Sequence, residues 1–184
     1  MVGTRRKLVG MAGTSDEPPR WLSQEERLAW VAFNGVLIKL PFALDTELRR
    51  TGGIAHFDYL VMSVISESPQ RMILMSELAT LTNASLSRLS HVVTRLENRG
   101  WVIRSVCAED RRATNVILTE VGMATVEAAA PGHVATVREL VVDALTTTQI
   151  HQLAAICQAI LGRLDPEGDW PPRRVGLDQD PGVS

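Results

Sequence analysis

The stretch that decides the fold is residues 76–122, "SELATLTNASLSRLSHVVTRLENRGWVIRSVCAEDRRATNVILTEVG". Its first residues predict a short helix. A turn of about four residues separates this helix from a second one over 84–99, which Thr82 or Asn83 caps and Gly100 ends. The runs "WVIRSV" and "NVILT" then predict two β-strands joined by a loop, because β-branched residues favour strands.

The helix predicted over 84–99 has two unlike faces. Its apolar residues lie at helical spacing and are predicted to point inward: Leu86, Leu89, Val92, Val93 and Leu96. The outer face carries short polar and basic side chains: Ser85, Ser87, Arg88, Ser90, His91, Thr94 and Arg95. Such a helix fits the DNA major groove, about 12 Å wide, where hydroxyl, guanidinium and imidazole groups reach base edges and phosphates. The order helix, turn, helix, strand, loop, strand therefore predicts a winged helix-turn-helix.

The loop between the two strands carries the adjacent arginines Arg111 and Arg112. Asp110 and Arg112 share a face of an extended chain, so we expect the carboxylate to hold the Arg112 guanidinium with a charge-assisted hydrogen bond. An arginine oriented in this way suits a narrow, negative minor groove, whereas Arg111 would meet a phosphate. From Arg71 to Arg112 there are seven arginines and four acidic residues, although the whole chain has a net charge of −2. The segment predicted to touch DNA is thus basic.

Helices are also predicted on the N-terminal side of this segment. Residues 23–26, "SQEE", form a capping box, and the helix that follows is apolar on more than one side. Pro41 should kink or restart it, and "TGG" at 51–53 should end it. A further helix is predicted from about Ile54 to Glu67.

On the C-terminal side a helix is predicted from Glu120 to about Ala144, interrupted or bent at Pro131–Gly132. A last helix begins with the T-x-x-Q box at 146–149 and carries a wide apolar stripe. Residues 1–20 and 165–184 are rich in Gly, Pro and charge, and we interpret them as mobile tails.

Several classes of function are disfavoured. No catalytic nucleophile, phosphate-binding or dinucleotide motif is present, so we expect neither an enzyme nor a cofactor. Cys107 and Cys157 are the only cysteines and lack the spacing of zinc ligands. We find no apolar run of about 20 residues for a membrane span and no signal peptide, which predicts a cytoplasmic protein.

The motifs "ELA", "RLENRGWVIR", "DRR" and "LTEVG" within 76–122 resemble the MarR family of bacterial transcriptional regulators, and a looser resemblance extends over 23–164. The resemblance implies that terminal helices of two subunits interlock into a homodimer, that 84–99 is the recognition helix, and that Asp110 and Arg112 form the wing pair. It also implies a small aromatic or phenolic effector, with pocket residues that a single sequence does not identify. His91 stands where the family commonly has Arg, which would weaken this DNA contact or make it sensitive to pH.

We therefore predict a mainly α protein with a small two-stranded β-hairpin wing, made of a winged helix-turn-helix domain and a helical dimerisation domain. The predicted boundaries are a mobile tail at 1–20, dimerisation helices in 21–53 and 120–164, the winged domain at 54–119, and a second tail at 165–184. The predicted function is a ligand-responsive repressor that binds a pseudo-palindromic double-stranded operator.

Alternatives remain open at this level. Cys107 beside the wing could make the regulator redox-responsive. A winged-helix protein-interaction adaptor that does not bind DNA is a second alternative. Arg95 and Arg99 could pair with Glu97 or Glu109 instead of contacting DNA. His56 and His133 are interpreted as structural histidines.

Overall fold

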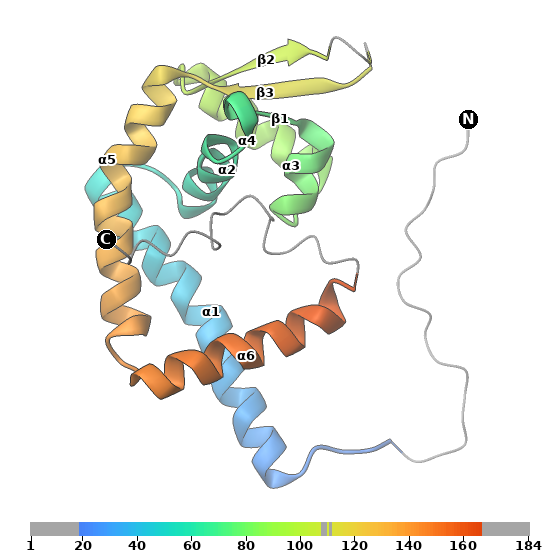
Figure 1. Cartoon of the computed structure of the whole chain (residues 1–184), viewed down its shortest axis with the longest axis vertical. Coiled ribbons are helices and arrows are strands. Elements are labelled where there is room, and N and C mark those ends of the chain that lie inside the picture. The colour runs from blue at the N-terminus through green and yellow to red at the C-terminus, as the bar shows by residue number, and fades with distance from the viewer. Residues whose placement is uncertain (1–18, 108–109, 111, 167–184) are drawn as a thin grey trace, which may run out of the picture. The chain divides into compact units, whose positions relative to one another are not determined.

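The computed structural model describes residues 19–107, 110 and 112–166 (Figure 1). The predicted tails 1–20 and 165–184 lie almost wholly outside these residues. The described chain forms two compact units, the first ending at Leu37 and the second beginning at Ile38. The boundary falls inside the first helix, and the domain limits given above stay predictions.

Helix α1 runs from Gln24 to Gly52. The predicted capping box is confirmed: the Glu26 amide donates to Ser23 Oγ (3.2 Å), and the Ser23 amide donates to Glu26 Oε2 (2.7 Å). The helix continues through Pro41, so the predicted restart is wrong. By length and composition alone α1 could cross a membrane, alone among the helices of the described chain, which corrects our expectation that no segment is so apolar.

Three helices build the core of the second unit: α2 (His56–Ser66), α3 (Met75–Leu81) and α4 (Leu86–Asn98). The start of α4 differs from the prediction. Its N-cap is Ser85, because Thr82 Oγ1 donates to the Leu78 carbonyl instead (2.7 Å) and Asn83 adopts a left-handed backbone with φ of 48°. The buried core joins these helices to α1, α5 and the sheet through Leu48, Ile54, Val61, Met62, Ile65, Leu78, Leu89, Val93, Leu96, Val102, Val116 and Val126.

The described residues form a three-stranded antiparallel sheet in the order β1 (Met72–Leu74), β3 (Thr114–Leu118), β2 (Val102–Val106). The predicted hairpin is β2–β3, with Arg104 opposite Val116. The prediction missed β1, a strand of three residues that follows a short 3₁₀ turn at Pro69–Arg71. Helices α2, α3 and α4 lie beneath the sheet in Figure 1, and their apolar side chains pack against its inner residues.

Helix α5 (Glu120–Val137) continues through Pro131 and passes into a π-helical turn, Arg138–Val142, so the predicted interruption is wrong. Its start requires Gly122. A Cβ built there would lie 2.1 Å from the Trp101 carbonyl oxygen, much closer than real contacts allow. The Gly122 amide donates to Thr119 Oγ1, the N-cap hydroxyl (3.0 Å). This close approach fixes α5 against the beginning of β2.

Helix α6 (Thr147–Leu164) begins with the predicted capping box of Thr146 and Gln149. None of its residues, all of which the structure describes, is buried. Leu153 and Ile156 remain 39% and 56% exposed although they belong to the apolar stripe. In the first unit, Leu28, Trp30 and Val31 are likewise more than half exposed.

Candidate nucleic-acid interface

Helix α4 presents the polar face that the sequence predicted. Four of its five predicted inward residues are buried: Leu89, Val92, Val93 and Leu96. Leu86 is 56% exposed, so its predicted inward position is wrong. It occupies the first turn of α4, where the helix projects beyond the core. The predicted outer residues Ser85, Ser87, Arg88, Ser90, His91, Thr94 and Arg95 are all exposed.

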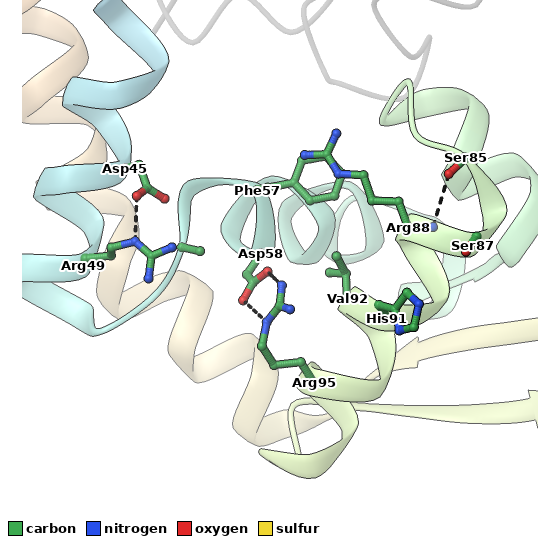
Figure 2. Close-up of a pocket in the computed structure, with 11 residues that line it drawn as sticks. Asp45, Arg49, Phe57, Asp58, Ser85, Ser87, Arg88, His91, Val92 and Arg95 are labelled. Atoms are coloured by element: carbon green, nitrogen blue, oxygen red, sulfur yellow. Dashed lines mark hydrogen bonds and ion pairs between the residues drawn. The ribbon is translucent and has the colours of Figure 1, made fainter.

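Two of these residues have an additional role in folding. Ser85 caps α4, because its Oγ accepts the Arg88 amide (3.2 Å). The Arg88 guanidinium lies over the Phe57 ring, 4.2 Å from its centroid (Figure 2). This cation–π contact restricts a long and otherwise mobile side chain at the edge of this polar face.

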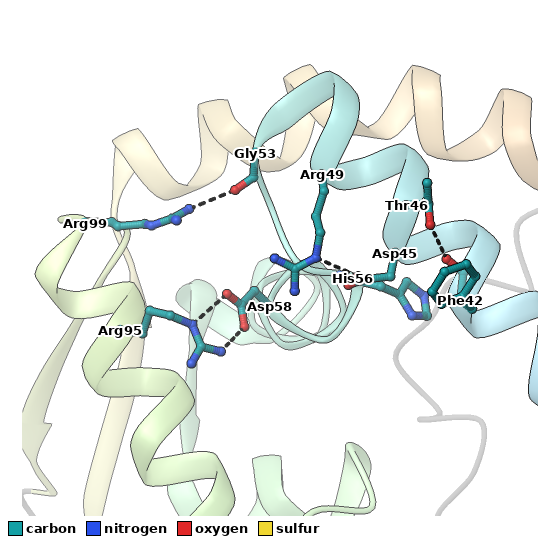
Figure 3. A network of polar contacts seen from close by, with 9 residues as sticks. All are labelled: Phe42, Asp45, Thr46, Arg49, Gly53, His56, Asp58, Arg95 and Arg99. Atoms are coloured by element: carbon teal, nitrogen blue, oxygen red, sulfur yellow. Dashed lines mark hydrogen bonds and ion pairs between the residues drawn. The ribbon is translucent and has the colours of Figure 1, made fainter.

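Arg95 is held by a carboxylate that local sequence does not reveal. Its Nη2 donates to Asp58 Oδ1 (2.5 Å) and its Nε to Oδ2 (3.0 Å), a bidentate pair (Figure 3). Asp58 is 2% exposed, whereas the Arg95 side chain is 48% exposed. The hydrogen bond with Asp58 raises the pKa of Arg95. Arg95 therefore has an ion-pair partner, but this partner is Asp58 and not Glu97. Glu109, the other partner considered above, lies outside the described residues.

The remaining arginines near α4 also have partners. Arg99 Nη1 donates to the Gly53 carbonyl (3.2 Å), and its guanidinium lies over the Trp101 ring. Glu97 pairs with Arg104 of β2, which also donates to the Ser90 carbonyl and to Thr94 Oγ1, at 3.0 Å each. Sequence reasoning overlooked Arg104, since its position within a strand gives no sign of a contact with a helix.

The wing differs from its prediction in one bond. Asp110 Oδ1 accepts the backbone amide of Arg112 (2.9 Å), not its guanidinium. An aspartate two residues before an amide commonly closes its own turn in this way, so Asp110 shapes the loop and leaves the Arg112 side chain exposed. Arg111 lies outside the described residues. A hollow of about 430 Å³ between the wing and α4 is lined by Arg112, Ser90 and Leu86, among others.

A second hollow, of about 570 Å³, lies between the end of α1, α2 and α4 (Figure 2). Phe57, Arg88 and Arg95 line it together with Asp45 and Arg49. Asp45 accepts from Arg49 Nε (2.6 Å) and from the His56 amide (2.8 Å), and these bonds lower the pKa of Asp45, the Arg49 bond most. The hollow therefore combines an aromatic wall with several cationic groups.

The two predicted structural histidines lie together. His56 and His133 stack with ring centroids 6.0 Å apart, and Tyr59 contacts His133 at 4.8 Å. Burial lowers the pKa of both histidines, and the neighbouring His56 lowers that of His133 further. Among the described residues, His133 Nδ1 is a buried atom without a hydrogen-bond partner.

The described part of the chain contains no cluster of three His, Cys, Asp or Glu side chains suited to a metal ion. Cys107 and Cys157 are both half-buried free thiols. The Cys107 amide donates to the Ala113 carbonyl (3.0 Å) at the base of the wing loop.

Comparison with known proteins places these features in context. The family model described as "MarR family" matches residues 53–113. The chain is 40% identical to Sco3205, a MarR family transcriptional regulator from Streptomyces coelicolor solved in complex with DNA; the match covers 82% of this chain and 94% of that one, with a TM-score of 0.78. It is 38% identical to AbsC, a MarR family regulator from the same organism, over 79% and 98% of the two chains (TM-score 0.75). The transcriptional repressor MprA of Escherichia coli is 28% identical over 65% of this chain and 67% of its own.

Proposed function

The chain belongs to the MarR family of transcriptional regulators, and we propose that it acts as a homodimeric repressor that binds a pseudo-palindromic operator and is released by a small ligand. As a member of this family it is a winged-helix DNA-binding regulator, not an enzyme. The observation that carries the proposal is the exposed polar face of α4, which borders the same hollow as Arg112 of the wing.

The proposed reading geometry assigns α4 to the major groove and the wing to the adjacent minor groove. Ser87, Arg88 and His91 lie on the exposed side of α4 and would meet base edges. Ser85 and Ser90 would contact phosphates. The part of the Arg95 guanidinium that is exposed and not bonded to Asp58 would also contact a phosphate. Arg112 would enter the minor groove, with Asp110 shaping its loop and Arg111 assigned to a phosphate.

The homodimer is supported by the terminal helices. Leu153 and Ile156 of α6 are exposed apolar side chains, as are Leu28 and Trp30 of α1 in the first unit. Such side chains gain about 1.5–3 kcal/mol each on full burial, and a second copy of the same helices offers a matching surface. Packing of α1 in such an interface would also account for an apolar helix in a cytoplasmic protein.

Ligand response is supported by the hollow of about 570 Å³, a volume typical of small-molecule sites. Phe57 offers a ring face, and Arg88 offers a guanidinium with no carboxylate partner among the described residues. An aromatic carboxylate bound there would compete with DNA for Arg88. Repression itself is proposed because the similar protein MprA is named a transcriptional repressor.

Selection from a library of randomised duplexes tests the central proposal. The full-length protein is expected to enrich a two-fold symmetric sequence whose half-site centres lie about 10–10.5 bp apart or a multiple of that distance. Arg112→Ala, selected in parallel, should lose the preference at the wing-contacted bases. If the wild-type protein enriches no sequence, specific DNA recognition by this chain is wrong.

The ligand proposal has its own test. Benzoate, the simplest aromatic carboxylate, is titrated into the complex of protein and selected duplex while fluorescence anisotropy is followed. We expect release of DNA, and a weaker response in Phe57→Leu, with sodium chloride at equal ionic strength as the control. Equal release by benzoate and chloride would argue against the site.

A further inference from the structure

The recognition helix α4 is fastened to the rest of its unit along both borders of its exposed face. An α-helix turns about 100° per residue, so Ser87, His91, Thr94 and Asn98 point within about 60° of one another, toward solvent. Ser90 and Glu97 border this face on one side, and Arg88 and Arg95 border it on the other. Each border makes contacts with a different element.

On the border formed by Arg88 and Arg95, the contacts are with α2. The Arg88 guanidinium lies over Phe57, and Arg95 forms its bidentate pair with Asp58. Phe57 and Asp58 are consecutive residues of α2, so one turn of that helix holds this side of α4 (Figure 2).

On the first border a single residue makes the contacts. Arg104 of β2 donates from its Nη1 to Glu97 Oε2. Its Nη2 donates to the Ser90 carbonyl and to Thr94 Oγ1, at 3.0 Å each. The Arg104 amide also donates to Glu97 Oε1 (3.3 Å). Ser90, Thr94 and Glu97 follow one another along one side of α4, so Arg104 joins about two turns of the helix to the sheet.

We propose that Arg104 is a positioning residue for DNA recognition, which fixes the rotation of α4 about its own axis and so determines the base edges that Ser87 and His91 reach. The inference rests on the proposed function, since it presupposes that α4 reads bases. A side-chain tip about 5–6 Å from the helix axis moves by about 2 Å when the helix rotates by about 20°. A hydrogen bond to a base edge tolerates only a few tenths of an ångström, so a rotation of this size abolishes it.

The chemistry requires arginine. The planar guanidinium directs several N–H groups in fixed directions and thereby meets a carboxylate, a carbonyl and a hydroxyl together. A lysine ammonium could neutralise Glu97 but would not span the three acceptors. The side chain of Arg104 is only 26% exposed, and both of its terminal nitrogens already have acceptors. The Arg104 guanidinium is therefore used in contacts with α4, whereas the Arg112 guanidinium is available to contact DNA.

The test compares Arg104→Met and Arg104→Lys with wild-type full-length protein on two duplexes, the one that the wild type selects from a randomised library and a scrambled one. Arg138→Met is the matched control, because Arg138 pairs with Asp143 beyond the end of α5 and makes no hydrogen bond or ion pair with the described residues of α4 or the wing. Glu97→Gln preserves the side-chain shape and weakens the same cluster, so it decides the question if an Arg104 variant does not fold. Circular dichroism sets a temperature at which every assayed variant is folded.

We expect Arg104→Met to lose roughly tenfold or more of the preference for the selected duplex, with its affinity for the scrambled duplex and its salt dependence unchanged. Arg104→Lys should behave like Arg104→Met, and Glu97→Gln should lie between them and the wild type. Arg138→Met should keep the full preference.

Three results would overturn the proposal. The first is full preference in Arg104→Lys and Glu97→Gln. The second is an equal loss on both duplexes with a shallower salt dependence, since this marks a phosphate contact. The third is a lower melting temperature with intact preference, which marks a purely structural role. Failure of the proposed function is distinguishable, because the wild-type protein would then select no duplex at all.

Discussion

Helices α4 and α6 both carry a wide apolar stripe, yet their environments differ. Helix α4 buries Leu89, Val92, Val93 and Leu96 against its own chain. Helix α6, described over its whole length, buries none of its residues. The difference teaches that the winged part of the chain is completed by intramolecular packing, whereas no other part of the described chain covers α6, as expected for the homodimer interface proposed above. Mutations in α6 should therefore affect the assembly of the dimer, whereas mutations in the winged part should affect folding stability or DNA binding.

The largest effect is expected from Leu153→Glu in α6. A carboxylate in the middle of the apolar stripe would have to be buried in the dimer, so we expect the dimer to dissociate to monomers. Sedimentation equilibrium measures the mass. Gln158→Glu, about 140° away around the helix, is the matched control and should remain dimeric. An unchanged mass for Leu153→Glu would contradict the assignment of α6 to the interface.

The next effect concerns the winged part. Gly122→Ala should lower the free energy of unfolding by about 3 kcal/mol, because the new Cβ would meet the Trp101 carbonyl at 2.1 Å. Urea denaturation of the full chain measures this. Gly132→Ala is the control: it lies in the same helix with open space around its Cβ position, and should change stability by no more than about 1 kcal/mol. Similar losses for both variants would refute the close-contact argument.

Arg95→Met should cost about 2 kcal/mol of stability, because it leaves the buried Asp58 carboxylate without its cation. This loss of stability is smaller than is usual when a buried ion pair is broken, because Arg95 is half exposed and water can replace part of the contact. Arg50→Met removes an exposed pair with Glu47 and should show no measurable change. If Arg95→Met is as stable as wild type, Asp58 does not depend on this partner.

Arg112→Ala should leave folding and mass unchanged and weaken operator binding by about 1.5 kcal/mol. Fluorescence anisotropy on the selected duplex measures the affinity. Arg138→Ala removes the same charge away from the proposed interface and serves as control. Unchanged affinity in Arg112→Ala would remove the wing from the reading mechanism.

The smallest effect is a dependence of stability on pH. The pKa values of His56 and His133 are lowered in the folded chain, so the unfolded chain binds more protons as the pH falls below 6.5. Stability is therefore complete above that pH and decreases below it. His133→Phe should flatten the decrease between roughly pH 7 and 5, measured by urea denaturation, whereas the exposed His151→Gln should not. An identical pH profile in His133→Phe would show that the pair does not contribute.

The helical order, the hairpin and both capping boxes could be predicted from the sequence because they depend on local signals. Glu26 lies three residues from Ser23, and Gln149 three from Thr146, so the bonds follow from spacing. Several residues between 82 and 85 could cap the start of α4. The sequence does not show that the Thr82 hydroxyl bonds to the Leu78 carbonyl and leaves Ser85 as the N-cap. The prolines at 41 and 131 show the same limit, since both lie inside helices that continue through them.

The contacts that hold α4 could not be predicted. Asp58 lies 37 residues before Arg95, and only the fold brings the two together. Arg104 and Glu97 are separated by the turn between α4 and β2, so their pairing depends on the angle at which the strand leaves the helix. Strand β1 escaped notice because three apolar residues carry no periodicity.

The most direct test of the central claim is an anisotropy titration of DNA from upstream of the protein's own gene, beside a scrambled duplex, at one stated salt concentration. The duplex concentration is held well above the dissociation constant, so that the breakpoint gives stoichiometry. We predict tight binding to the native duplex alone, saturating at two chains per duplex. Equal binding to both duplexes, or saturation at one chain per duplex, would contradict sequence-specific recognition by a homodimer.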